Sequence, residues 1–404
     1  MIVIKSIYSL ILRGGGLLGG FLSVLCISRW LSPSEAGLFF NIVSFLIAFA
    51  LFSRLGQDKS LIPEVIESKT DSKIIANALS ISLYPFFVFS LAWFLIFDIK
   101  YIWMVFFLYL MIFNNIISSY FKAKFKSNFS ILFENSFIYS ILLILLLIHF
   151  FIREKNMNLD NVIYLYCMSI AIQSLLIFFY DKAWFIEVVR EIKVIDIGDF
   201  FYILFKLKGF IIIAYLGHLL RFLPILVLMV YFDLEDLASY KVIEQISMSS
   251  GVIIVAVSSL YSPYYAKYKS NWSELKIYFI QSIRISIILG LFFVLFMLYI
   301  KDAYFLFSKF NYIKYGNIYF VFLIASFFNV ISAPFYNVLI MTKKQKIALK
   351  ALFFSISISL FFIFISIFYG SLFILSLSQT VFYFSILLFS IFYVLMECKK
   401  NYIE

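Results

Sequence analysis

The chain repeats one pattern almost from end to end: a stretch of about twenty apolar residues, then a short break rich in charges or turn-forming residues. Hydrophobic residues make up 64% of the 404 residues and charged residues only 14%, whereas soluble domains are roughly one-quarter charged. A helix of about 20 apolar residues crosses roughly 30 Å of hydrocarbon. The sequence therefore predicts an all-α polytopic membrane protein with about 12 transmembrane helices and leaves no room for a soluble domain.

Twelve apolar stretches define the predicted spans. They lie near residues 7–30, 36–56, 74–97, 101–121, 129–152, 162–180, 209–231, 238–262, 277–300, 317–341, 351–369 and 371–396. The first stretch is too long for a signal-peptide core and ends in bulky residues instead of a small-residue cleavage site, so we expect it to be a retained helix.

The basic residues are distributed unevenly between the breaks. Of the 33 Lys and Arg residues, 22 fall on one side of the predicted membrane, seven on the other and four inside spans. The positive-inside rule then places both termini in the cytoplasm. This topology explains the net charge of +11 better than a nucleic-acid partner does, and we expect no nucleic acid to bind.

An internal repeat suggests two halves. The segment LSPSEAGLF after the first span aligns with FDLEDLASY after the seventh at an offset of 201 residues, so that Glu35 matches Asp236. The longest break lies between the halves and contains apolar residues at helical spacing, from Trp184 to Ile192, opposite charged ones. The prediction is an N-terminal six-helix lobe at 1–180, a cytoplasmic amphipathic connector at 181–208 and a C-terminal six-helix lobe at 209–404.

Charges inside a bilayer are costly and normally face an aqueous cavity or a bundle interior. The candidate substrate-binding residues, mostly basic, are Arg13, His218, Arg221, Arg54, Lys241 and Arg284. Three positions separate His218 from Arg221, so both lie on one helix face near the bilayer midplane. For these two and Arg13 we favour contact with an anionic substrate.

The other charged positions have alternative interpretations. Lys241 either contacts substrate or forms an intrahelical ion pair with Glu244, three residues later. Arg54 and Arg284 are close enough to the cytoplasmic side for their side chains to extend to that surface. The acidic residues Glu134 and Glu244 are candidates for coupling transport to a proton or sodium gradient.

No catalytic motif is recognisable. A Walker loop, a paired His and carboxylate cluster and a Ser, His and Asp set are all absent from the sequence. The three cysteines lie on different spans without metal-ligand spacing, so we expect no disulfide, metal or cofactor. The chain is predicted not to be an enzyme.

Three segments resemble a known family. They are SLILRGGGLLGGFLSVLCISRWLSPSEAGLF at the start, FSRLGQDKSLIPEV after the second span, and FNVISAPFYNVLIMTKKQKIALK around the tenth. They resemble the Wzx-type flippases of O-antigen and capsule units, in the polysaccharide transporter family of the MOP (multidrug/oligosaccharidyl-lipid/polysaccharide) exporter superfamily. The resemblance implies a V-shaped, MATE-like fold with alternating access in the bacterial inner membrane.

The resemblance also implies a substrate and partners. The substrate would be undecaprenyl diphosphate carrying an oligosaccharide, flipped from the cytoplasmic to the periplasmic leaflet, and Arg13 and the basic residues of the seventh span lie where such families often place cavity cations. Membrane lipids, a polymerase and a chain-length regulator would be its partners. Three alternatives stay open: a multidrug or cation exporter of the same superfamily, a peptidoglycan-precursor flippase, and a membrane polymerase or ligase of the same glycan pathway.

Overall fold

The computed structural model describes residues 2–401 except 58–59, 62–63, 66–70, 98, 125, 154–156, 181, 194, 270, 309–311 and 343. Within these ranges every regular element is helical, which confirms the all-α prediction. Eight helices are long and apolar enough to cross a membrane, and four shorter apolar helices occupy the remaining predicted spans. The chain divides into two compact units, and the division into lobes at 180 and 208 stays a prediction.

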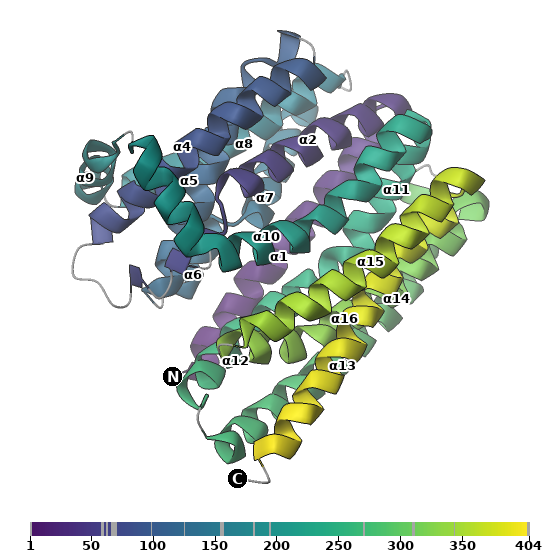
Figure 1. Ribbon diagram of the computed structural model, residues 1–404. Helices are drawn as coiled ribbons and strands as arrows, with labels where there is room; N and C mark the ends of the chain where they lie inside the picture. The colour runs from purple at the N-terminus through teal and green to yellow at the C-terminus, as the bar shows by residue number, and fades with distance from the viewer. Residues whose placement is uncertain are drawn as a thin grey trace. The chain divides into compact units, whose positions relative to one another are not determined.

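Unit 1 comprises residues 1–31 and 38–218. Its helices are α1 (Ile2–Trp30), most of α2 (Pro33–Ser53), α4 (Asp71–Ile96), α5 (Met104–Ala123), α6 (Ser127–Leu132), α7 (Asn135–Arg153), α8 (Leu159–Tyr180), α9 (Lys182–Glu191) and the first part of α10 (Ile197–Tyr231). α5 packs against α4 and α8, and α7 packs against α1 and α8 (Figure 1).

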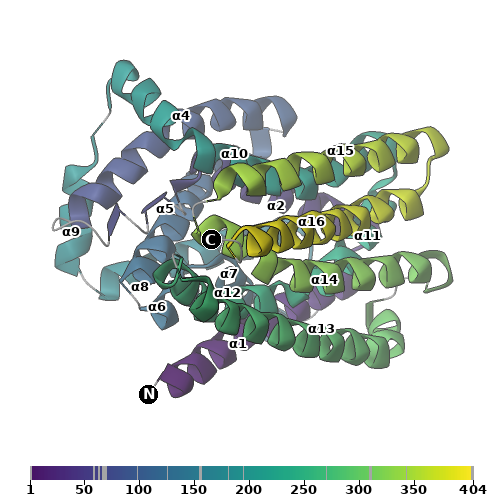
Figure 2. The same cartoon turned by 60° about the horizontal axis from the view of Figure 1, so that its bottom comes forward.

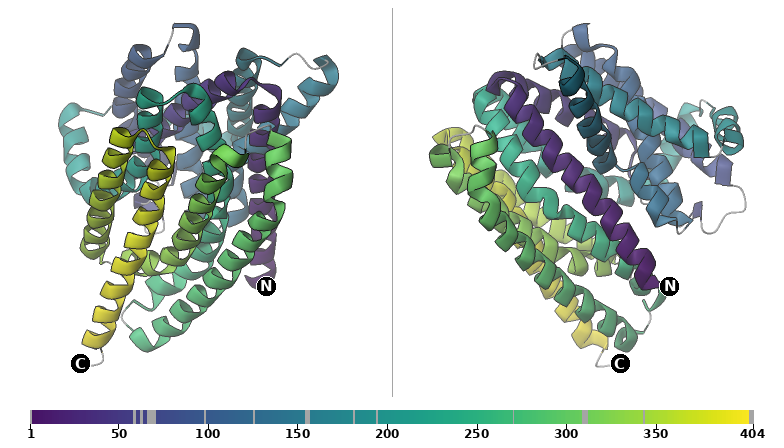
Figure 3. Two further views of the ribbon diagram at one scale, coloured as in Figure 1. Left: turned by 90° about the vertical axis from the view of Figure 1, so that its right-hand side faces the viewer. Right: turned by 180° about the vertical axis from the view of Figure 1, so that it is seen from behind.

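Small residues bring α1 and α7 close together. A Cβ atom added at Gly19 would collide with the side chain and backbone of Ser140, whereas one added at Gly15 would meet nothing within 4 Å. The Ser23 hydroxyl donates a hydrogen bond of 2.7 Å to the Tyr139 carbonyl oxygen of α7. Close approach of this kind increases dispersion contacts between membrane helices. α1 runs as one continuous helix (Figure 3, right).

The predicted span at 129–152 is not continuous. α6 and α7 are separated by a turn at Phe133 and Glu134. Gln173 of α8 donates from Nε2 to the carbonyl oxygens of Leu132 (2.7 Å) and Glu134 (3.0 Å), and the Glu134 oxygen also accepts from the Phe137 amide. A helix break inside a membrane protein is tolerated where such side chains satisfy the backbone.

Unit 2 comprises residues 32–37 and 219–404. It holds the rest of α10, then α11 (Leu234–Ser247), the 3₁₀ segment η2 (Met248–Ser250), α12 (Gly251–Lys267), α13 (Trp272–Ser308), α14 (Tyr312–Met341), α15 (Gln345–Tyr369) and α16 (Leu372–Asn401). α14 contacts α11, α12, α13 and α16, and α15 lies along α16 (Figure 2). The 3₁₀ segment η2, between α11 and α12, interrupts the predicted span at 238–262.

The structure reproduces the register of the internal repeat. α2 begins at Pro33 and α11 at Leu234, the same 201-residue offset that aligned the two sequence segments. Ser32 caps α2, since its amide and hydroxyl both donate to the Glu35 carboxylate. Within unit 2, Gly37 lies so close to the Leu234 carbonyl oxygen that a Cβ atom could not be accommodated there.

The predicted connector contains α9 and the start of α10. One face of α9 is buried at Val188 while Arg190 on the same helix is exposed, as an amphipathic helix requires. α9 packs against α4 and α8 (Figure 2). α10 begins at Ile197, so the seventh span starts about three turns earlier than its apolar stretch.

Candidate functional site

Three of the predicted substrate-binding residues lie on the helices expected for them. Arg13 is in α1, and His218 and Arg221 are in α10. Pro224 follows Arg221 by three residues in the same helix. Their side chains are outside the described part of the structure. Their role in binding an anion therefore stays a prediction.

Arg54 lies in the tight turn that ends α2. Leu55 and Gly56 adopt positive φ angles of 52° and 71°, and the Gln57 amide donates to the Arg54 carbonyl oxygen over 2.9 Å. The turn directs the Arg54 side chain inward, where only 7% of it is exposed. The sequence suggested that this side chain extends to the surface, but it is buried.

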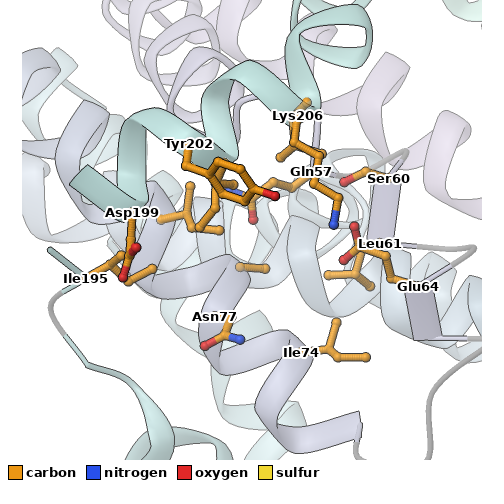
Figure 4. Close-up of a pocket in the computed structure, with 14 residues that line it drawn as sticks. Gln57, Ser60, Leu61, Glu64, Ile74, Asn77, Ile195, Asp199, Tyr202 and Lys206 are labelled. Carbon is orange, nitrogen blue, oxygen red and sulfur yellow. The ribbon is translucent and has the colours of Figure 1, made fainter. Parts of the chain in front are cut away.

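A cavity of about 470 Å³ opens beside this turn, inside unit 1 (Figure 4). Its walls are the described residues Gln57, Ser60, Leu61 and Glu64, one face of α4 and one face of the start of α10. The lining residues are Gln57, Ser60, Leu61, Glu64, Ile74, Asn77, Ala78, Ile81, Ile195, Asp199, Tyr202, Ile203, Lys206 and Leu207. Described residues of FSRLGQDKSLIPEV, one carrier of the family resemblance, thus contribute to the turn and to one wall.

The walls share a helical spacing. Each contributes residues at positions i, i+3, i+4 and i+7, for example Ile74, Asn77, Ala78 and Ile81 on α4. Residues three or four positions apart lie on the same side of a helix, so these residues face the cavity together. The sequence contained this signal, but its mixed polarity did not distinguish it from a solvated helix face.

Hydrogen bonds join α4 to α9 and to the residues between α9 and α10. The Tyr84 hydroxyl donates to the Ile195 carbonyl oxygen, and the Lys193 amide donates to the Ser80 hydroxyl over 3.0 Å. The Ser72 hydroxyl donates to the Glu187 carboxylate over 2.7 Å. These bonds lead the chain into α10 beside the cavity.

Gln57 is the most buried polar side chain of the cavity. Only 2% of it is exposed, and neither Nε2 nor Oε1 has a hydrogen-bond partner in the described part of the chain. Figure 4 shows Tyr202 and Lys206 pointing from α10 into the cavity, with Lys206 directed toward Glu64. Sequence reasoning did not identify Gln57, because an amide carries no charge to mark it.

Lys241 and Glu244 form the intrahelical ion pair that was one of the two interpretations. The Nζ–Oε2 distance is 2.5 Å, and the two side chains are 14% and 10% exposed. Gln379 of α16 donates from Nε2 to the second Glu244 oxygen over 2.6 Å. Both carboxylate oxygens are therefore already engaged by residues of unit 2.

The remaining predicted charges lie apart from this pair. Glu134 lies in the turn between α6 and α7 and pairs with Lys122 at 3.0 Å. Arg284 is exposed on α13. Lys100 and Asp160 form an exposed pair at 2.7 Å outside the predicted spans, and the hydrogen bond to Asp160 raises the pKa of Lys100.

No group of three or more His, Cys, Asp or Glu side chains that could hold a metal ion is found among the described residues. The described cysteines Cys26 and Cys167 lie on separate helices, α1 and α8.

Comparison with solved structures identifies the fold. The chain superposes on a MATE-family multidrug resistance transporter of the MOP superfamily in its inward-facing conformation with a TM-score of 0.68 at 14% identity, covering 98% of both chains. A MOP-superfamily transporter from Pyrococcus furiosus, whose binding pocket has a reversed polarity that suggests a different function, gives 0.68 at 15% identity over 98% of this chain and 95% of that one. An outward-facing MATE-family transporter gives 0.64 at 14% identity over 97% and 92%.

No family model matches the chain, and no curated protein sequence does. The structural likeness is nevertheless complete along the chain. The chain has the fold of these MOP-superfamily structures, which confirms the predicted MATE-like, all-α fold class.

Proposed function

We propose that this chain, which has the fold of MOP-superfamily transporters, flips an undecaprenyl-diphosphate-linked oligosaccharide of the O-antigen or capsule type across the bacterial inner membrane. The observation that carries the proposal is the excess of basic residues within its apolar spans, foremost Arg13 on α1 and Arg221 on α10. A cation in the bilayer needs an anionic partner, and a diphosphate is the anion that arginine binds best through paired hydrogen bonds.

The membrane potential favours this direction of transport. An inside-negative potential drives negative charge outward. Each negative charge moved out releases about 2.3 kcal/mol per 100 mV, so a dianionic head gains on the order of 4 to 5 kcal/mol at a potential of about 100 mV. The polyprenyl tail stays in lipid and costs nothing to reorient. Coupling to a proton or sodium gradient through Glu244 or Glu134 is a separate proposal, and a polymerase with its chain-length regulator would consume the flipped unit.

The main rival is a multidrug exporter, because two of the similar structures are multidrug resistance transporters. Cationic drugs favour acidic side chains in a binding site, and this chain carries 33 basic against 22 acidic residues. The Pyrococcus furiosus transporter supports a different substrate, since reversed pocket polarity in the same fold suggests a different function there. Drug resistance on expression would favour the rival.

The proposal is tested in a gene-deletion strain complemented with variants. We expect the deletion to abolish surface glycan and to accumulate single lipid-linked units facing the cytoplasm, and Arg13→Ala or Arg221→Ala to fail to rescue either defect. Arg190→Ala is the matched control, since Arg190 is exposed on α9, and it should rescue fully. Units accumulating on the external face would contradict a flippase and indicate a polymerase.

A further inference from the structure

We propose that the cavity of unit 1 lined by Gln57, Ser60, Leu61 and Glu64, one face of α4 and the start of α10 is a carbohydrate-binding site. The class of ligand is inferred from the cavity itself. The identity of the ligand in the cell rests on the proposed function: it is the sugar portion of the lipid-linked unit, bound on the predicted cytoplasmic side.

The size and construction of the cavity suit a small ligand. Its volume of about 470 Å³ falls within the roughly 300–1,000 Å³ typical of small-molecule sites. The hydrogen bonds from the Lys193 amide to Ser80 and from the Tyr84 hydroxyl to the Ile195 carbonyl oxygen join the residues just before α10 to α4. Contacts that position one side of a site before the ligand arrives lower the cost of binding.

Gln57 shows that the cavity has unused hydrogen-bonding capacity. Only 2% of its surface is exposed, and neither amide atom has a hydrogen-bond partner in the described chain. Buried polar groups are normally satisfied, so an orphaned amide in a cavity wall calls for a ligand. An amide both donates and accepts, which matches a hydroxyl that does the same.

The other polar side chains extend the same chemistry. Asn77 adds a second amide, Asp199 a carboxylate and Ser60 a hydroxyl, around one cavity. Tyr202, 73% exposed, points into it from α10 and offers a flat ring on which the C–H face of a sugar can stack (Figure 4). Planar polar groups combined with an aromatic ring recognise a compact polyol.

Two other ligand classes fit less well. A free phosphate or diphosphate would meet the carboxylates of Glu64 and Asp199 with only Lys206 in favour. A divalent cation needs several oxygen ligands converging, and no such group of three acidic or imidazole residues exists among the described residues. A neutral, hydroxyl-rich ligand avoids both penalties.

The test measures equilibrium binding of methyl glycosides to the purified full-length protein in nanodiscs, using glucose, galactose, rhamnose, N-acetylglucosamine and N-acetylgalactosamine derivatives. We expect at least one to bind, with Kd weakened at least about tenfold by Gln57→Leu, which removes the buried amide. Tyr202→Ala should weaken it similarly, and because Tyr202 is exposed this variant does not depend on core packing.

Two variants are matched controls. Phe201→Ala removes an aromatic ring next to Tyr202 that does not line the cavity, and Asn329→Leu removes a buried amide in unit 2. Both should keep Kd within about twofold. The inference is overturned if no glycoside binds, if Gln57→Leu and Tyr202→Ala both bind normally, or if pyrophosphate displaces the glycosides.

Failure of this inference and failure of the proposed function give different results. Proteoliposomes that flip the lipid-linked unit without any glycoside binding would sink the carbohydrate site and keep the flippase. Glycoside binding without flipping would support the carbohydrate site and contradict the flippase. If Tyr202→Ala weakens binding of the lipid-linked unit but not of bare undecaprenyl diphosphate, the sugar of the precursor is the ligand; equal weakening of both overturns the inference.

Discussion

The two units satisfy the polar groups beside their helix breaks with different chemistry. In unit 1 the buried network is made of amides: Gln173 donates to two backbone carbonyl oxygens of the α6–α7 turn and accepts from Asn114 over 2.8 Å, while the Lys122–Glu134 ion pair at the same turn is partly exposed. In unit 2 the network is ionic: Lys241 pairs with Glu244, which accepts from Gln379. Gln173 and Gln379 each lie on the last span of the predicted half.

The contrast separates a structural network from one that can respond to ions. Amides do not titrate, so the network of unit 1 keeps the same hydrogen bonds at any physiological pH. A carboxylate can exchange its partner for a proton or a cation, and doing so in a low-dielectric interior changes the energy of the helices it joins. The amide network of unit 1 and the ionic network of unit 2 can therefore serve different ends.

The largest expected effect comes from breaking the ion pair of unit 2. Lys241→Met leaves Glu244 buried with its charge uncompensated, which costs about 3–5 kcal/mol of folding stability. Thermal unfolding in detergent measures the loss. Lys241→Met combined with Glu244→Met should recover most of it, and a double variant as unstable as the single one would show that the pair does not act as a unit.

Removing the neutral bridge of unit 1 should cost less. Gln173→Leu leaves the carbonyl oxygens of Leu132 and Glu134 without their side-chain donor, a loss of about 1–3 kcal/mol in the same unfolding assay. Gln379→Leu is the control, because Lys241 continues to pair with Glu244 in its absence. If Gln379→Leu proves the more damaging, the ionic network depends on its amide more than the neutral one does.

The last comparison concerns ion coupling: Glu244→Gln keeps the side-chain shape but leaves the Lys241 ammonium buried without its carboxylate, so it should cost about as much stability as Lys241→Met, about 3–5 kcal/mol. We nevertheless expect this variant to make flipping in proteoliposomes insensitive to an imposed proton or sodium gradient. Glu134→Gln, whose carboxylate pairs with Lys122 beside the turn, should keep the response of the wild type. A gradient response retained by Glu244→Gln would exclude Glu244 from coupling.

Part of the fold was accessible to sequence reasoning because hydropathy and helix starts are local properties. The apolar stretches predicted the spans, and the aligned segments around Glu35 and Asp236 predicted the matching starts of α2 and α11. The breaks at Glu134 and at η2 were missed, since the few polar residues at each did not separate the apolar stretch into two spans. At the first break, Gln173, distant in sequence, bonds to two of the carbonyl oxygens.

The sequence by itself determined that this chain crosses a membrane many times, because about twenty apolar residues in a row cannot be dissolved in water. It also determined which charges stand inside the spans. Only the tertiary structure decided their surroundings: Arg54 is buried by a turn, Lys241 is neutralised by Glu244, and Gln57 is left unpartnered in a cavity. Hydrogen bonds and ion pairs act over a few ångströms, so their partners are chosen by packing and not by order along the chain.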